Sequence, residues 1–303
     1  MLLALSILPL ALTILCGYAV ARSGMIPRDQ WQSIETLSFK VLIPALIVSA
    51  IAGSDAPVAG FGGLVTALLM ALALVGLALF GLRLLAGPRL ANPQFTSLFQ
   101  TSMRWNAFVT LAAADQLLRG SFDEIGVAIA VSIPLINVLC ILVLAGFGPG
   151  KTDARSLARV LARNPLIQAS AVGLALKLSG LSLPEPVFAT LDLLGRASIG
   201  VGLLALGAGI SLRRLGRWNT QVALGLLLRP VITPLLFLLC ATSVGLNPTQ
   251  TFVGVLIFAS PAATNGFIVA RQMGGDAELY IDVLTWQTLL SLLVIPAWAY
   301  LLL

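Results

Sequence analysis

The chain has 303 residues, of which 58% are hydrophobic and only 10% are charged, and its mean hydropathy is +1.01. A soluble domain of this length carries about a quarter charged residues, so most of this chain's surface is predicted to face lipid. The formal charge is +6 and there is no histidine, which excludes histidine-ligated zinc and serine–histidine hydrolysis.

Ten apolar segments have about the 20 residues that a bilayer-spanning helix needs, and we predict an all-α integral membrane protein. The spans are expected at residues 2–21, 33–52, 61–85, 94–118, 124–147, 165–180, 187–210, 218–244, 249–273 and 279–302. Turn pairs such as Gly87-Pro88 and Asn247-Pro248 separate them. Cys16, Cys140 and Cys240 each lie inside an apolar run, which favours packing over a disulfide or a metal cluster.

Most of the basic residues lie in or beside the loops between the spans, which indicates membrane topology and no nucleic-acid partner. The odd-numbered loops hold Arg22 and Arg28; Arg83 and Arg89; Lys151, Arg155, Arg159 and Arg163; and Arg213, Arg214 and Arg217. The even-numbered loops and the termini add little beyond Arg119 and Lys177. Because Lys and Arg stay on the cytoplasmic side, the odd loops are predicted inside and both termini outside.

The longest loop, the fifth, covers residues 148–164 and divides the chain into halves 1–147 and 165–303, which match at a nearly constant offset. Pro9 and Pro165 are 156 residues apart, and Asn106 and Asn265 are 159 apart. Each half contains five spans, and an odd number makes the second half enter the membrane from the opposite side. The halves are therefore predicted to be inverted repeats, an architecture typical of secondary transporters.

Asn106 and Asn265 lie near the centres of the fourth and ninth spans. Asparagine is costly in hydrocarbon and favours helix caps, and Ser260, Pro261 and Gly266 weaken a continuous helix. We expect both spans to be broken near mid-membrane, with each asparagine capping the half-helix that follows. The free N–H groups and the positive dipole end would then face an anion. The alternative is that each asparagine bonds to a neighbouring helix.

Other polar residues within the spans are candidates for the same site. Arg104 brings a positive charge to the predicted break in the fourth span, where it contacts the substrate or pairs with Asp115 or another acid within the membrane. Asn137 and Gln287 either line a cavity or bridge helices. The predicted substrate-binding residues are Arg104, Asn106, Asn137, Ser260, Pro261, Thr264, Asn265 and Gln287.

The acidic residues within the spans either carry a coupling ion or form structural ion pairs. We expect Asp282 to lie at a solvated helix end, and the alternative is that it carries a coupling proton or sodium ion, a role for which Asp115 is also a candidate. Asp192 and Arg196 are one helical turn apart and are expected to form a structural ion pair. No catalytic residue, metal site or cofactor is predicted.

The stretch from Ser260 to Asn265, followed by Gly275-Asp276-Ala277 and Pro296, resembles the end of the auxin efflux carrier family of membrane transporters. Asn164-Pro165 also fits. The resemblance implies that spans four and nine cross at their breaks, in a fold related to the bile-acid–sodium symporters. It further implies a scaffold of spans 1, 2, 6 and 7 and a transport domain of spans 3–5 and 8–10. Members carry small organic acids such as auxin, malate and malonate.

The predicted function is an elevator-type secondary carrier for a small organic anion such as a carboxylate, and not an enzyme. The alternatives are a proton- or sodium-coupled symporter of a different solute class, and a sensor or channel of the same fold. The short fifth loop favours a bacterial type in the inner (plasma) membrane, with lipid as its surroundings. We expect a homodimer through spans 2 and 7, where Gly195, Gly202 and Gly209 form a small-residue face.

Overall fold

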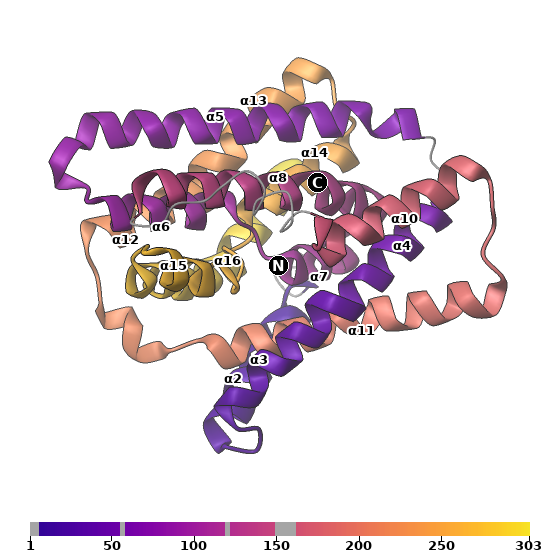
Figure 1. The fold of residues 1–303 in the computed structure, drawn as a ribbon, viewed down its shortest axis with the longest axis horizontal. Helices are drawn as coiled ribbons and strands as arrows, with labels where there is room; N and C mark the ends of the chain where they lie inside the picture. The colour runs from indigo at the N-terminus through magenta and orange to yellow at the C-terminus, as the bar shows by residue number, and fades with distance from the viewer. Residues whose placement is uncertain (1–5, 55–57, 119–121, 149–161) are drawn as a thin grey trace. The chain divides into compact units, whose positions relative to one another are not determined.

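The computed structural model describes residues 6–54, 58–118, 122–148 and 162–303, and Figure 1 shows its elements. All regular structure in these ranges is helical. The predicted apolar segments are helical over most of their described residues, because a helix satisfies its backbone hydrogen bonds internally where lipid offers no partner. The all-α class is therefore confirmed.

Within the described ranges, six helices are long and apolar enough to cross a membrane. They are Asp29–Gly53, Gly62–Arg89, Asp123–Phe147, Glu185–Gly209, Thr220–Val244 and Ala277–Leu302. Three further helices, Leu8–Ser23, Pro165–Ser179 and Pro248–Ala259, are apolar but shorter. The total of ten spans, their orientation and the inverted repeat stay predictions.

The described chain divides into two compact units, and the first draws on residues 1–62, 108–134 and 158–210. Its helices are α2 (Leu8–Ser23), α3 (Arg28–Leu37), α4 (Ile43–Gly53), α10 (Pro165–Ser179), α11 (Glu185–Gly209), most of α7 (Ala107–Leu118) and the first part of α8 (Phe122–Phe147). A π turn, η1 (Ser38–Leu42), joins α3 to α4, and a short 3-10 turn, η2 (Val58–Phe61), follows α4. Within this unit α11 packs against α2 and α4, and α10 packs against α4.

Glycines bring the helices of the first unit close together. A Cβ on Gly17 would overlap the carbonyl of Leu204, and a Cβ on Gly207 would overlap the carbonyl of Ile14. The backbones of α2 and α11 are therefore in direct contact, as small residues permit in membrane proteins. The predicted ion pair between Asp192 and Arg196 is confirmed, with 2.8 Å between Oδ2 and Nε.

Two of the three glycines predicted to form a dimer surface, Gly195 and Gly202, pack against other helices of the same chain. A Cβ on Gly195 would lie 2.8 Å from the Leu46 Cα, and a Cβ on Gly202 would overlap the Phe108 ring, whereas Gly209 has open space beside it. The interpretation of Gly195 and Gly202 as a free dimer surface is thus wrong. The homodimer itself stays a prediction.

The second unit draws on residues 63–107, 135–157 and 211–303. Its elements are α5 (Gly62–Ala86), η3 (Gly87–Arg89), α6 (Asn92–Met103), η4 (Leu212–Gly216), α12 (Thr220–Leu227), η5 (Leu228–Ile232), α13 (Thr233–Val244), α14 (Pro248–Ala259), α15 (Gly266–Met273), α16 (Ala277–Leu302) and the rest of α8. The turn η5 is a π turn that joins α12 to α13. Helix α16 contacts α6, α12, α14 and α15, so it is the central helix of this unit.

Candidate functional site

Two helices of the second unit end among buried residues, and the chain then continues without regular structure. Helix α6 ends at Met103 and the next helix begins at Ala107; α14 ends at Ala259 and α15 begins at Gly266. The residue after α14, Ser260, is extended with a ψ of 150°, because the proline ring that follows disfavours the helical conformation. The predicted interruption of the fourth and ninth segments is confirmed.

The two interruptions are hydrogen-bonded to each other. The backbone N–H of Asn106 donates to the Pro261 carbonyl over 2.9 Å. Unwound backbone in a membrane protein needs protein partners for its polar groups, since lipid supplies none. The hydrogen bond therefore satisfies one backbone donor of the first interruption and one backbone acceptor of the second.

Gln287 on α16 connects both interruptions to a third helix. Its Oε1 accepts from the Ala262 N–H at 2.9 Å, and its Nε2 donates to the carbonyls of Thr101 at 3.3 Å and Gly225 at 3.0 Å. The side chain is almost fully buried. Of the two interpretations of Gln287, the structure supports the helix bridge, because both of its N–H donors are used by carbonyls.

Tyr280, also on α16, contacts the interruption between α14 and α15. Its buried hydroxyl donates to the Ala263 carbonyl over 2.6 Å. The same ring lies against Gly266, where a Cβ would overlap the hydroxyl oxygen. Glycine is therefore required at the start of α15 by the close approach of Tyr280.

Arg229, in the π turn η5, is fully buried and binds the carboxyl-terminal ends of both interrupted helices. Its guanidinium donates to the carbonyls of Ser102 (2.7 Å), Met103 (3.2 Å), Ile257 (2.6 Å) and Ser260 (3.0 Å). Helix carboxyl ends carry unpaired carbonyls and partial negative charge, both of which a guanidinium neutralises. The sequence interpretation missed Arg229, although an arginine in the middle of the predicted span 218–244 is itself a signal of function.

Arg104 directly follows α6 and is 4% exposed. Its Nε donates to Gln100 Oε1 at 3.1 Å, and its Nη1 donates to Asn137 Oδ1 at 2.6 Å. The ion pairs among the described residues involve Arg196, Arg214 and Arg217, and none involves Arg104. The buried guanidinium is thus held by neutral amides, and Asp115 is exposed and accepts from Gln116.

Asn265 does not form the predicted helix cap. Asn265 stands at the N-cap position of α15, but its side chain makes no capping bond and its buried Oδ1 has no partner within the described chain. The prediction that Asn265 caps α15 is therefore wrong. The Ser260 hydroxyl donates to the Leu256 carbonyl, Thr264 lies half-buried in the turn before α15, and Asn106 is 3% exposed.

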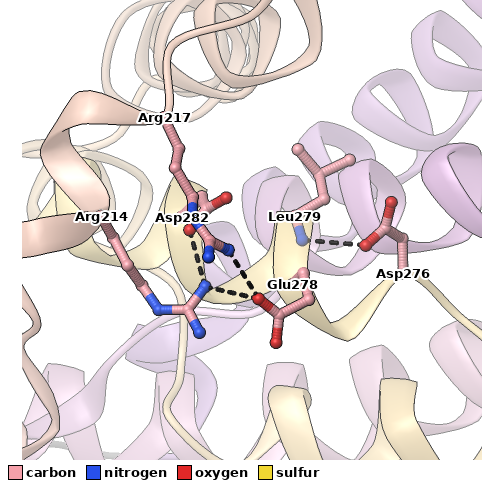
Figure 2. A network of polar contacts seen from close by, with 6 residues as sticks. All are labelled: Arg214, Arg217, Asp276, Glu278, Leu279 and Asp282. Carbon is pink, nitrogen blue, oxygen red and sulfur yellow. Dashed lines mark hydrogen bonds and ion pairs between the residues drawn. The ribbon is translucent and has the colours of Figure 1, made fainter.

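Asp282 on α16 is buried and ion-paired, so the solvated helix end is the wrong interpretation. Its Oδ1 lies 2.8 Å from Arg214 Nη1. Figure 2 shows this pair and the contacts of Arg214 and Arg217 with Glu278. Burial lowers the pKa of Arg214, but the hydrogen bonds and charges of Asp282 and Glu278 outweigh it and raise the pKa. Within the described ranges, no three Cys, Asp or Glu side chains come together as metal ligands.

Two interrupted helices that contact each other at their breaks, with buried arginines beside them, resemble the broken helices that form solute-binding sites in membrane transport proteins. The family described as "Membrane transport protein" has a model that matches residues 151–299.

Three curated relatives are similar to this chain. A putative malonate transporter of Rhizobium meliloti is 28% identical over 149 residues, 49% of this chain and 47% of the relative. The uncharacterized transporter YfdV of Escherichia coli is 24% identical over 205 residues, 64% of this chain and 63% of the relative. A probable auxin efflux carrier component 5c of Oryza sativa is 29% identical over 156 residues, 50% of this chain and 42% of the relative.

The matched regions span less than two thirds of the length of each of these relatives. They nevertheless confirm the resemblance found in the sequence. Over these regions the chain is similar to membrane transporters of the auxin efflux carrier family.

Proposed function

We propose that the chain is a secondary carrier for a small organic anion of the carboxylate class. The observation that carries the proposal is Arg104, a buried guanidinium next to the two joined interruptions that amides hold and that no carboxylate of the described residues pairs with. A buried charge is expensive unless it is paired, so an anionic ligand is the natural counterpart. The relative named as a putative malonate transporter supports a carboxylate.

The proposed cycle is of the elevator type. Spans 3–5 and 8–10 carry the anion and move against a scaffold of spans 1, 2, 6 and 7, in a homodimer that sits in the bacterial inner membrane. Both termini are outside in this proposal. In this proposal Asn106, Asn265 and Thr264 complete the anion site around Arg104, and a proton or a sodium ion is the candidate for a coupling ion.

Counterflow of radiolabelled malonate in proteoliposomes tests the proposal. Parent protein should show saturable counterflow, which distinguishes a carrier from a channel and from a sensor. Loss of a charge-assisted contact typically costs about 1.5–3 kcal/mol, so Arg104→Ala should weaken malonate binding about ten- to a hundredfold. The matched control is Arg196→Ala, which removes an exposed arginine and should leave binding unchanged.

The reasoning fails if Arg104→Ala, folded and inserted at the parental level, binds and exchanges malonate as well as the parent does. In that case the anion site lies elsewhere and Arg104 has only a structural role. Absence of malonate binding by the parent protein would count against the proposed carboxylate class.

A further inference from the structure

Gln100 lies in the last turn of α6, four residues before Arg104, and its side chain is fully buried. Its Oε1 accepts from Arg104 Nε at 3.1 Å. Its Nε2, at the other end of the same amide, has no hydrogen-bond partner within the described chain. A buried amide N–H without a partner is destabilising, and native proteins rarely leave one unexplained.

The orientation of the Gln100 amide is fixed by its neighbour. Oxygen and nitrogen of a glutamine amide are placed by the hydrogen bonds they make. Turning the amide over would bring its NH2 group against the Arg104 N–H, so two donors would face each other. The acceptor therefore points to Arg104, and the unpartnered donor points away from it.

We propose that Gln100 is a specificity-determining residue of the anion site, whose Nε2 donates to a second oxygen-bearing group of a ligand held by Arg104. This inference rests on the proposed function, since it needs a carboxylate at Arg104. One residue, Gln100, would then have two roles: its oxygen orients the guanidinium, and its nitrogen contacts the ligand.

The contact predicts which acids the site distinguishes. A site built to hydrogen-bond a ligand group rejects an analogue that lacks the group, because a buried donor is then left unpaired. The site should therefore prefer an acid with a second oxygen acceptor near its carboxylate over a simple monocarboxylate. Malonate and propionate are a suitable pair, since propionate has a methyl group where malonate has its second carboxylate.

Binding of malonate and propionate to purified protein in detergent, measured by calorimetry, tests the contact. The parent should bind malonate about ten- to a hundredfold more tightly than propionate, the range for one hydrogen bond to a charged group. Gln100→Leu removes the donor and should bring malonate close to the affinity for propionate. Gln100→Asn shortens the side chain, keeps the amide and should also reduce the preference, which provides a second variant if the leucine variant does not fold.

The ratio of the two affinities separates contact from positioning. A residue that only orients Arg104 would lower the affinity for both acids by the same factor, whereas a residue that also contacts the second group lowers the affinity for malonate by the larger factor. Gln32→Leu, which changes an exposed glutamine on α3, is the matched control and should keep the parental ratio.

Three results overturn the inference. The first is a parent that binds the two acids equally, and the second is a Gln100→Leu variant, monodisperse and with parental melting, that keeps the parental ratio. The third is an equal loss of both acids, which would make Gln100 a positioning residue only. If Arg104→Ala weakens malonate binding in any of these cases, the proposed function survives. If the parent binds neither acid, the proposed function and this inference fail together.

Discussion

Replacing Arg229 by methionine should strongly destabilise the second unit. Methionine is apolar, flexible and long enough to fill most of the space, so the change removes hydrogen bonds and charge while leaving little cavity. Four buried carbonyls, at the ends of α6 and α14, lose their donor. At about 1 kcal/mol or more for each unsatisfied carbonyl, the expected loss in the free energy of unfolding is about 4 kcal/mol.

Unfolding of purified variants in mixed micelles, followed by circular dichroism, measures this loss. Arg229→Lys keeps the positive charge but lacks the planar fork that reaches both helix ends, so it should recover only part of the stability. Arg217→Met is the matched control in the same unit. Its side chain is 57% exposed and pairs with the exposed Glu278, so its loss should stay under about 1 kcal/mol.

The reasoning about Arg229 would be refuted if Arg229→Met lost no more free energy of unfolding than the Arg217→Met control. That result would mean that the two helix ends need no common cation. A large loss in Arg229→Met that Arg229→Lys fully restores would show that charge alone, and not the geometry of the four hydrogen bonds, is responsible.

Further predictions concern the second interruption, the ion-pair network and the topology. Gly266→Ala should lower stability by about 1–3 kcal/mol in the same micelle assay, because its Cβ would overlap the Tyr280 hydroxyl. Arg214→Met should cost about 1–3 kcal/mol, since Asp282 is buried and would lose its ion-pair partner. A cysteine at position 152, in the fifth loop, should react with an impermeant maleimide only from the cytoplasmic side; this loop lies mostly outside the described residues.

Each of these predictions has its own control. Gly209→Ala adds the same methyl group where nothing lies within 4 Å, so it should leave stability unchanged. Asp282→Asn should reproduce most of the loss in Arg214→Met if the two side chains act as a pair. Cys16 is exposed and must first be replaced, so that labelling reports position 152 alone. Labelling of intact cells from outside would reverse the predicted topology.

The sequence located the helices and the two interruptions well, for reasons that are local. Hydropathy marks apolar helices because each residue contributes its own transfer free energy, and Pro261 and Gly266 interrupt a helix through their own backbone geometry. The same local signals do not say which side chains meet. Asn265 has the chemistry of a cap, yet its side-chain oxygen does not reach the first amides of α15.

The partners that hold the interruptions together could not be read from the sequence, because they come from segments far apart in the chain. Arg229 lies more than 120 positions from Ser102, whose carbonyl it binds. Gln287 lies 186 positions from Thr101. Polar residues within apolar spans mark candidates for such roles, but whether one binds a ligand or a neighbouring carbonyl depends on packing. For the same reason Asp282 was predicted at a solvated end and is found buried beside Arg214.

The wide turn at Leu228–Ile232 makes the length of its helix, and not only its composition, a constrained quantity. A π turn holds one residue more than an α turn, because its hydrogen bonds close over five residues instead of four. Each residue of an α-helix rotates the chain by about 100°. Loss of a single codon within this turn would let it close as an ordinary α turn, so α12 would keep nearly its present facing relative to α13. Loss of a codon within α12 has no such compensation: it would leave the hydropathy profile almost unchanged while rotating the start of α12 by about that angle relative to Arg229.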